Sequence, residues 1–244
     1  MTESRESDFT HALIAGFVVV SAVNLLGQII GIELLTQITK PLLMVLLFVW
    51  AWHVLPRPRS RAGQYLLVGI VFAWIGDLFL MVAGDLFFLL GIAGFLVMQI
   101  CYIFAFLTMP GKQHLLKKAP LLIAPFVLYW AGMNVLLQPG VLRIPVLIYS
   151  VALVGMSAVA LDVAPRCTAP QRTRVVVGAV LFVISDTFIA LAAFSSLELG
   201  NWQGIIVMGT YVVAQYLIVT SVARTLVAHH SSPMATPEAN SLAE

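Results

Sequence analysis

The chain has 244 residues, of which 61% are hydrophobic and 10% are charged, and its mean hydropathy is +1.00. A soluble domain carries about 25% charged residues, so this composition excludes an ordinary soluble protein and indicates one that crosses a membrane several times. The formal net charge of +2 adds little, and no nucleic-acid partner is expected.

A helix needs about 20 apolar residues to cross a bilayer. Eight windows qualify, at residues 10–31, 39–56, 63–83, 87–108, 117–137, 141–161, 173–194 and 202–225. The sequence therefore predicts an all-α bundle of eight transmembrane helices over residues 10–225. A polar N-terminus precedes it at residues 1–9, and a tail that is predicted to be disordered follows it at residues 226–244.

Lys and Arg residues gather in alternate loops. Nine follow the second, fourth and sixth windows: Arg57, Arg59, Arg61, Lys112, Lys117, Lys118, Arg166, Arg172 and Arg174. The opposite connections hold Lys40 and Arg143. Because cytoplasmic loops carry the positive charge, both termini are predicted to be cytoplasmic, in a protein of the plasma or inner membrane.

The two halves of the chain share a pattern. A shift of 109 residues carries Val68, Gly69, Val71, Ile75, Asp77 and Phe79 onto identical residues at Val177, Gly178, Val180, Ile184, Asp186 and Phe188. The same shift carries Leu90, Gly91, Tyr102 and Ala105 onto Leu199, Gly200, Tyr211 and Ala214. Apolar composition does not explain the matches at Asp, Gly and Tyr, so we interpret them as a duplicated four-helix unit with parallel halves, at about 10–110 and 117–225.

Asp77 and Asp186 lie at matching depth inside apolar windows, in the predicted outer half of the membrane. An acid at such a depth costs roughly 2.5 to 3.5 kcal/mol on insertion scales and usually marks a pathway or a reaction site. Two carboxyls that lie close together do not both ionise easily. We therefore expect the pair to meet in a polar pocket and share a proton. The alternative is that each acid only makes a structural hydrogen bond.

Other polar side chains are candidates for the same pocket. Gln99 and Tyr102 are three residues apart, and Tyr211 and Gln215 are four apart, so each pair shares a helix face. Tyr149 lies part-way down its helix from the same side. These residues either line the pocket or hydrogen-bond across helix interfaces without a chemical role.

Lys40 begins the second window from the predicted outer side. It is either a boundary residue that reaches lipid headgroups or a cation that holds a phosphate or lowers the pKa of a neighbouring acid. The chain has no His cluster, no paired Cys ligands and no glycine-rich phosphate loop, so neither a metal nor a cofactor is expected.

Several segments together resemble the YhhN-like lysoplasmalogenase family over about residues 37 to 225. They are Thr39-Lys40-Pro41, Gly76-Asp77-Leu78-Phe79-Leu80-Met81, Phe88-Leu89-Leu90-Gly91 with Tyr102, Ser185-Asp186, and Trp202 with Thr210-Tyr211 and Ala214-Gln215. One departure is Gln99, where the resemblance leads us to expect a histidine.

The resemblance implies an integral membrane hydrolase that acts on a lysophospholipid with a vinyl ether bond and releases a fatty aldehyde. Such a bond is cleaved by protonating the outer alkene carbon and capturing the resulting oxocarbenium ion with water. On this hypothesis one of Asp77 and Asp186 donates the proton, and the other stabilises the cation and orients water. Lys40 would hold the phosphate, and Tyr102, Tyr149, Tyr211 and Gln215 would bind the substrate or water.

Two other functions remain open from the sequence. A transporter with parallel repeats would use the two acids to carry protons, although the prolines lie mostly near helix beginnings and no helix pair is strongly interrupted. An intramembrane aspartyl protease would use Gly76-Asp77, but no Pro-Ala-Leu follows the second acid. Release of aldehyde by purified protein would separate the hydrolase from the transporter.

Overall fold

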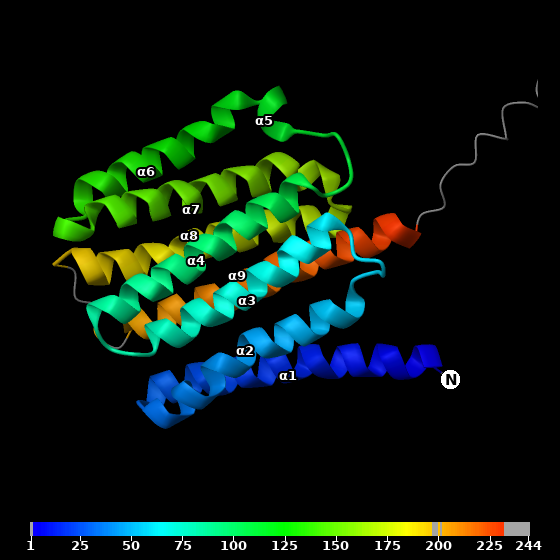
Figure 1. Cartoon of the computed structure of the whole chain (residues 1–244), viewed down its shortest axis with the longest axis horizontal. Helices are drawn as coiled ribbons and strands as arrows, with labels where there is room; N and C mark the ends of the chain where they lie inside the picture. Colours follow the sequence, from blue (N-terminus) through cyan, green and yellow to red (C-terminus); the bar gives the residue numbers. More distant parts are fainter. Residues whose placement is uncertain (1, 197–199, 201, 232–244) are drawn as a thin grey trace, which may run out of the picture.

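The structure is a computed structural model that describes residues 2–196, 200 and 202–231. Within these residues the chain is helical and has no β-strand, which confirms the predicted all-α bundle (Figure 1). The long helices are α1 (Thr2–Ile30), α2 (Glu33–Val54), α3 (Arg61–Leu80), α4 (Asp85–Leu107), α7 (Arg143–Val163), α8 (Ala169–Phe194) and α9 (Trp202–Ser231). Shorter elements lie between α4 and α8: α5 (Leu115–Lys118), η1 (Pro120–Ile123), α6 (Ala124–Leu136), η2 (Gly140–Leu142) and η3 (Ala164–Arg166).

Among the described residues, seven helices are long and apolar enough to cross a membrane. The fifth predicted window, at 117–137, differs because it is divided into α5, η1 and the 13-residue α6. A helix of that length covers about 20 Å, less than the roughly 30 Å of a bilayer core. The eight equivalent spans predicted from the sequence are therefore seven long helices and one short one.

Three helix boundaries differ from the predicted windows. Helix α1 already begins at Thr2, so most of the predicted polar N-terminus is helical. Helix α2 begins at Glu33, which places Lys40 and Pro41 inside it and not at its opening. Helix α9 continues to Ser231, so the predicted tail is helical over 226–231, and its residues 232–244 lie outside the described residues.

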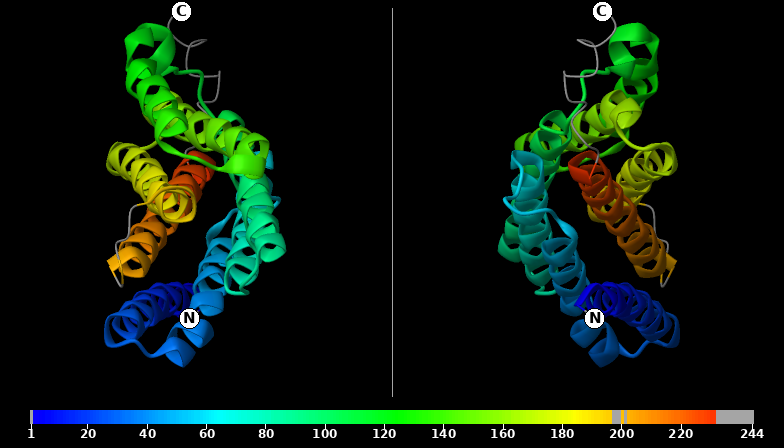
Figure 2. Two further views of the ribbon diagram at one scale, coloured as in Figure 1. Left: turned by 90° about the vertical axis from the view of Figure 1, so that its left-hand side faces the viewer. Right: turned by 90° about the vertical axis from the view of Figure 1, so that its right-hand side faces the viewer.

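Two helix pairs form the centre of the bundle. Helix α3 packs along α4, and α8 packs along α9. Seen along the helices, these pairs lie on opposite sides, with α1 and α2 at one edge and α5 to α7 at the other (Figure 2). The start of α1 and the end of α9 lie at the same end of the bundle (Figure 1). The cytoplasmic location of both termini stays a prediction.

Helices α3 and α8 bury equivalent positions. The buried residues of α8 are Gln171, Val175, Gly178, Ala179, Phe182, Ser185 and Asp186. Each lies 109 positions after a buried residue of α3: Ala62, Leu66, Gly69, Ile70, Ala73, Gly76 and Asp77. The two helices thus share a burial pattern at this spacing, and the duplicated four-helix unit stays a prediction.

Gly69 allows α4 to approach α3 closely. A Cβ atom at this position would lie 2.5 Å from Cε1 of Tyr102, and overpacking of this kind typically costs about 1–3 kcal/mol. We expect Gly69→Ala to lower the melting temperature of the purified protein by several degrees. Gly155→Ala is the control, because its Cβ would have no heavy atom within 4 Å. Equal melting temperatures for the two variants would contradict this account of the α3–α4 contact.

Candidate active site

Asp77 lies in the last turn of α3, and both of its carboxyl oxygens have partners. Its Oδ1 lies 3.5 Å from Nζ of Lys40 on α2, and its Oδ2 accepts a hydrogen bond of 2.6 Å from the Tyr211 hydroxyl on α9. The Asp77 residue is 2% exposed. This acid is therefore an enclosed, neutralised group that joins three helices.

Asp186 on α8 has a different environment, although it is also buried. Its Oδ2 accepts hydrogen bonds from the Tyr149 hydroxyl on α7 and from Nε2 of Gln99 on α4, the latter at 3.4 Å. Its Oδ1 makes no hydrogen bond to any described residue, and no cationic side chain of the described chain forms an ion pair with it. One oxygen of Asp186 is thus anchored, and the other is free.

The two carboxyls do not share a proton as the sequence led us to expect. Within the described residues no hydrogen bond joins Asp77 to Asp186, and each has its own partners. Their surroundings meet through an aromatic cluster in which the Phe95 ring lies edge-on to Tyr211, with ring centroids 5.8 Å apart. The reason for the difference is that separate helices, α2 and α7, supply a partner to each acid.

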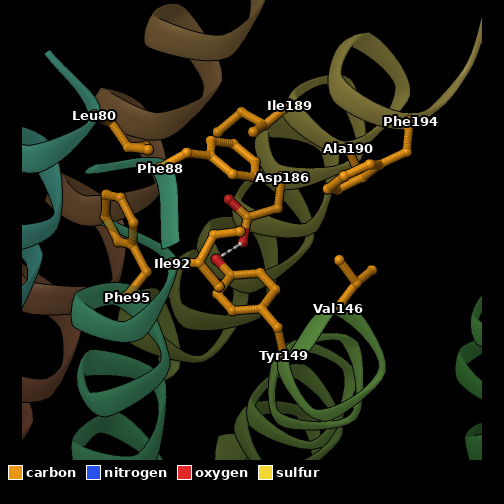
Figure 3. A pocket seen from close by; sticks show the side chains of 10 residues that line it. All are labelled: Leu80, Phe88, Ile92, Phe95, Val146, Tyr149, Asp186, Ile189, Ala190 and Phe194. Carbon is orange, nitrogen blue, oxygen red and sulfur yellow. Dashed lines mark hydrogen bonds between the residues drawn. The ribbon is translucent and has the colours of Figure 1, made fainter. Parts of the chain in front are cut away.

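Asp186 faces an apolar pocket between α3, α4, α7 and α8 (Figure 3). The pocket is lined by Leu80, Phe88, Ile92, Phe95, Val146, Tyr149, Asp186, Ile189, Ala190 and Phe194. Only Tyr149 and Asp186 of these carry polar side-chain atoms. The volume is about 40 Å³, which is enough for one water molecule. The structure therefore places one carboxyl beside a small space with an almost entirely apolar lining.

A wider hollow of about 390 Å³ adjoins this pocket. Leu80, Phe88 and Phe194 line both spaces, and the hollow extends to Gly84 and the exposed Asp85 at the turn between α3 and α4. That turn belongs to the end of the bundle predicted to face outward. The pocket thus lies next to the surface at the depth expected from the sequence.

Tyr102 and Gln215 are brought together, but not with either acid. The Tyr102 hydroxyl donates a 2.7 Å hydrogen bond to Oε1 of Gln215, whose Nε2 lies 3.2 Å from the sulfur of Met98. Both side chains are fully buried, and neither lines the pocket. Their predicted part in substrate binding stays a prediction, and in this structure they join α4 to α9.

The partners of the two acids occupy equivalent positions. Lys40 and Tyr149 are 109 residues apart in the sequence, and so are Asp77 and Asp186. In the predicted duplication, the Lys40–Asp77 ion pair would correspond to the Tyr149–Asp186 hydrogen bond. A lysine neutralises the charge of an acid, whereas a tyrosine donates one hydrogen bond to it. The two acids therefore have chemically different partners at positions with the same spacing.

The YhhN family model matches residues 35–222, which is 188 of the 244 residues and includes both acids and all of their partners. The chain belongs to the YhhN family. No curated protein and no solved structure matched it. With seven long apolar helices in its described part, this YhhN family member is a multi-pass membrane protein.

The site of this YhhN protein differs from the prediction in two respects. Gln99 was a candidate for the pocket without an assigned part in catalysis or substrate binding, and in the structure it contacts Asp186 but does not line the pocket. The apolar wall gave no signal because its Leu, Ile and Phe residues resemble the rest of the membrane helices. Among the described residues, no group of three His, Cys, Asp or Glu side chains is placed to hold a metal ion.

Proposed function

We propose that this protein is an integral membrane hydrolase that cleaves the vinyl ether bond of lysoplasmalogens, giving a fatty aldehyde and a glycerophospho-headgroup. The observation that carries the proposal is the Asp186 carboxyl, which has one anchored oxygen and one free oxygen in an apolar pocket. Membership of the YhhN family supports it as well. No cofactor takes part in this reaction, because an acid and a water molecule are sufficient.

Asp186 is the proton donor in this mechanism. An anionic carboxylate without a counter-charge is costly in an apolar site, whereas a neutral carboxyl suits the observed contacts. Its Oδ2 is then the carbonyl oxygen that accepts from Tyr149 and Gln99, and Oδ1 carries the proton. Oδ1–H gives that proton to the outer carbon of the vinyl ether, and the carbon bonded to the ether oxygen becomes an oxocarbenium ion.

The remaining steps need one water molecule. Water attacks the cationic carbon, and its proton passes to the Asp186 carboxylate, which restores the acid. The product is a hemiacetal, which collapses when its hydroxyl proton moves to the ether oxygen and the carbon–oxygen bond breaks.

Asp77 has a positioning role in this proposal. With Lys40 it forms a neutral pair that fixes the Tyr211 hydroxyl, and Tyr211 supports the Phe95 ring in the pocket wall. Displacing a supporting group by about 1 Å can reduce turnover by about 10²-fold, so this is the loss expected of Asp77→Asn. The Lys40 side chain is 19% exposed, and a further contact with the substrate phosphate stays part of the proposal.

The substrate is expected to enter from the hollow beside the α3–α4 turn. Its alkenyl chain would contact the apolar side chains that line both spaces, and its polar headgroup would remain near the turn. Activity is expected on lysolipids, whose single chain needs less room than two.

The test is aldehyde release by detergent-purified protein supplied with a lysoplasmalogen. The control substrate is the matching lysolipid with a saturated ether, which has no alkene to protonate. We expect aldehyde from the first substrate and none from the second. A proton-coupled transporter of a small solute or lipid would use the same acids and make no product, so absence of aldehyde would overturn the hydrolase proposal and favour the transporter.

A further inference from the structure

Gln99 presents an unpaired polar group next to the candidate acid. The residue is 0% exposed, and its Nε2 donates to Oδ2 of Asp186. Its Oε1 is buried and has no hydrogen-bond partner among the described residues. Most buried polar atoms in folded proteins are paired with protein or water, and an unpaired one costs about 1–3 kcal/mol. This exception lies at the candidate site.

The amide links the unpaired group to the acid directly. The oxygen and nitrogen of a glutamine side chain share one carbon atom, so the unpaired Oε1 belongs to the same amide as the Nε2 that contacts Asp186. Oε1 is an acceptor only, and a water molecule has two hydrogens to donate. Gln215 on α9 is another buried amide, and it has no unpaired end because Tyr102 and Met98 contact its two polar atoms.

We propose that Gln99 positions the water that attacks the oxocarbenium ion, and this inference rests on the proposed function. Its Oε1 accepts a hydrogen bond from one O–H of the water. The Asp186 carboxylate, after it has given its own proton to the alkene, accepts a hydrogen bond from the other O–H. The water oxygen forms the new bond to the cationic carbon, and the proton it loses restores Asp186. The Gln99 amide keeps all of its own hydrogens throughout.

The role proposed for Gln99 affects only the second of two successive steps, which are protonation of the alkene and capture of the cation by water. Protonation of the alkene needs Asp186, whereas capture of the cation needs water at the correct place. Without Gln99, the cation survives longer and can return a proton to Asp186, which regenerates the alkene. In heavy water Asp186 carries deuterium, so the outer alkene carbon gains a deuteron when the cation forms. If the cation then loses the hydrogen that this carbon originally carried, the alkene is regenerated with deuterium on its outer carbon.

The experiment compares purified wild-type protein, Gln99→Met and Asp186→Asn in heavy water with a lysoplasmalogen. Methionine keeps the length of the side chain and removes the oxygen and the nitrogen of the amide. Wild type is expected to make aldehyde and leave the remaining substrate unlabelled. Gln99→Met is expected to make aldehyde about 10²-fold more slowly and to leave deuterium in recovered substrate, and Asp186→Asn is expected to do neither.

Two further variants separate loss of the hydrogen-bond acceptor at position 99 from loss of any buried amide. Gln99→His restores an acceptor and a donor, and it is expected to recover aldehyde formation without labelling. Gln215→Met removes a buried amide whose ends are both bonded to protein, and its recovered substrate is expected to be unlabelled. If Gln99→Met does not fold, Gln99→Leu is measured in the same way.

Slow and unlabelled turnover by the Gln99 variant would overturn the inference, because Gln99 would then only orient Asp186. Wild-type turnover by that variant would overturn it too. If wild-type protein makes no aldehyde at all, the proposed function fails, and that result is distinct from either of these.

Discussion

Asp186→Asn is expected to lower aldehyde release by about 10³-fold or more while the protein folds and melts much as wild type does. Asparagine has nearly the same shape and can still accept a hydrogen bond from Tyr149, but its amide N–H is too weakly acidic to protonate the alkene. General acid catalysis contributes typically about 10²- to 10⁴-fold. Turnover of the lysoplasmalogen, measured as aldehyde released per purified protein, checks this result.

Glu33→Gln is the matched control for this variant. It makes the same carboxyl-to-amide change at an exposed residue in the first turn of α2, and it is expected to keep wild-type turnover. Comparison with Asp77→Asn is informative as well, because that change is expected to reduce turnover by no more than about 10²-fold. A larger loss for Asp77→Asn than for Asp186→Asn would reverse the roles assigned to the two acids.

Lys40→Met is expected to destabilise the protein by about 3 kcal/mol, which is the largest stability effect predicted for this site. The change leaves the enclosed Asp77 carboxylate without its cation, and breaking a buried ion pair from one side costs about 3–5 kcal/mol. The Lys40 side chain is 19% exposed, which places the effect at the lower end. Denaturant titration of the purified protein in mixed micelles measures the change in the free energy of unfolding.

The double variant Lys40→Met with Asp77→Leu distinguishes an ion-pair effect from a loss of packing. Replacing both partners by apolar residues is often neutral or stabilising, so the double variant is expected to recover most of the stability lost by Lys40→Met. Lys112→Met is the surface control, because Lys112 is exposed in the loop after α4. A double variant as unstable as Lys40→Met alone would contradict the pairing.

The sequence was sufficient to predict the general architecture and the location of the two acids. Apolar length indicated the helices, the loop charges indicated which helix ends lie together, and the 109-residue shift related Asp77 to Asp186. These features are local or periodic, so they can be read without knowing which helices touch. The short α6 was missed because a run of apolar residues does not show where Pro120 and Pro125 divide the helix.

The partners of the acids could not be predicted in the same way. Asp77 and Tyr211 are 134 residues apart, and Asp186 and Gln99 are 87 apart. A membrane helix is apolar on its core face and on its lipid face, so hydrophobic periodicity does not reveal which face turns inward. The choice between a lysine partner and a tyrosine partner for each acid therefore appeared only with the helices in place.

The most direct test of the central claim is the position of deuterium in the aldehyde that the wild-type protein forms in heavy water. Protonation of the outer alkene carbon by Asp186 predicts one deuterium at the carbon next to the aldehyde group, and aldehyde release by Asp186→Asn that is lower by about 10³-fold or more. Aldehyde without deuterium at that carbon, or labelled aldehyde formed equally fast by Asp186→Asn, would contradict the account.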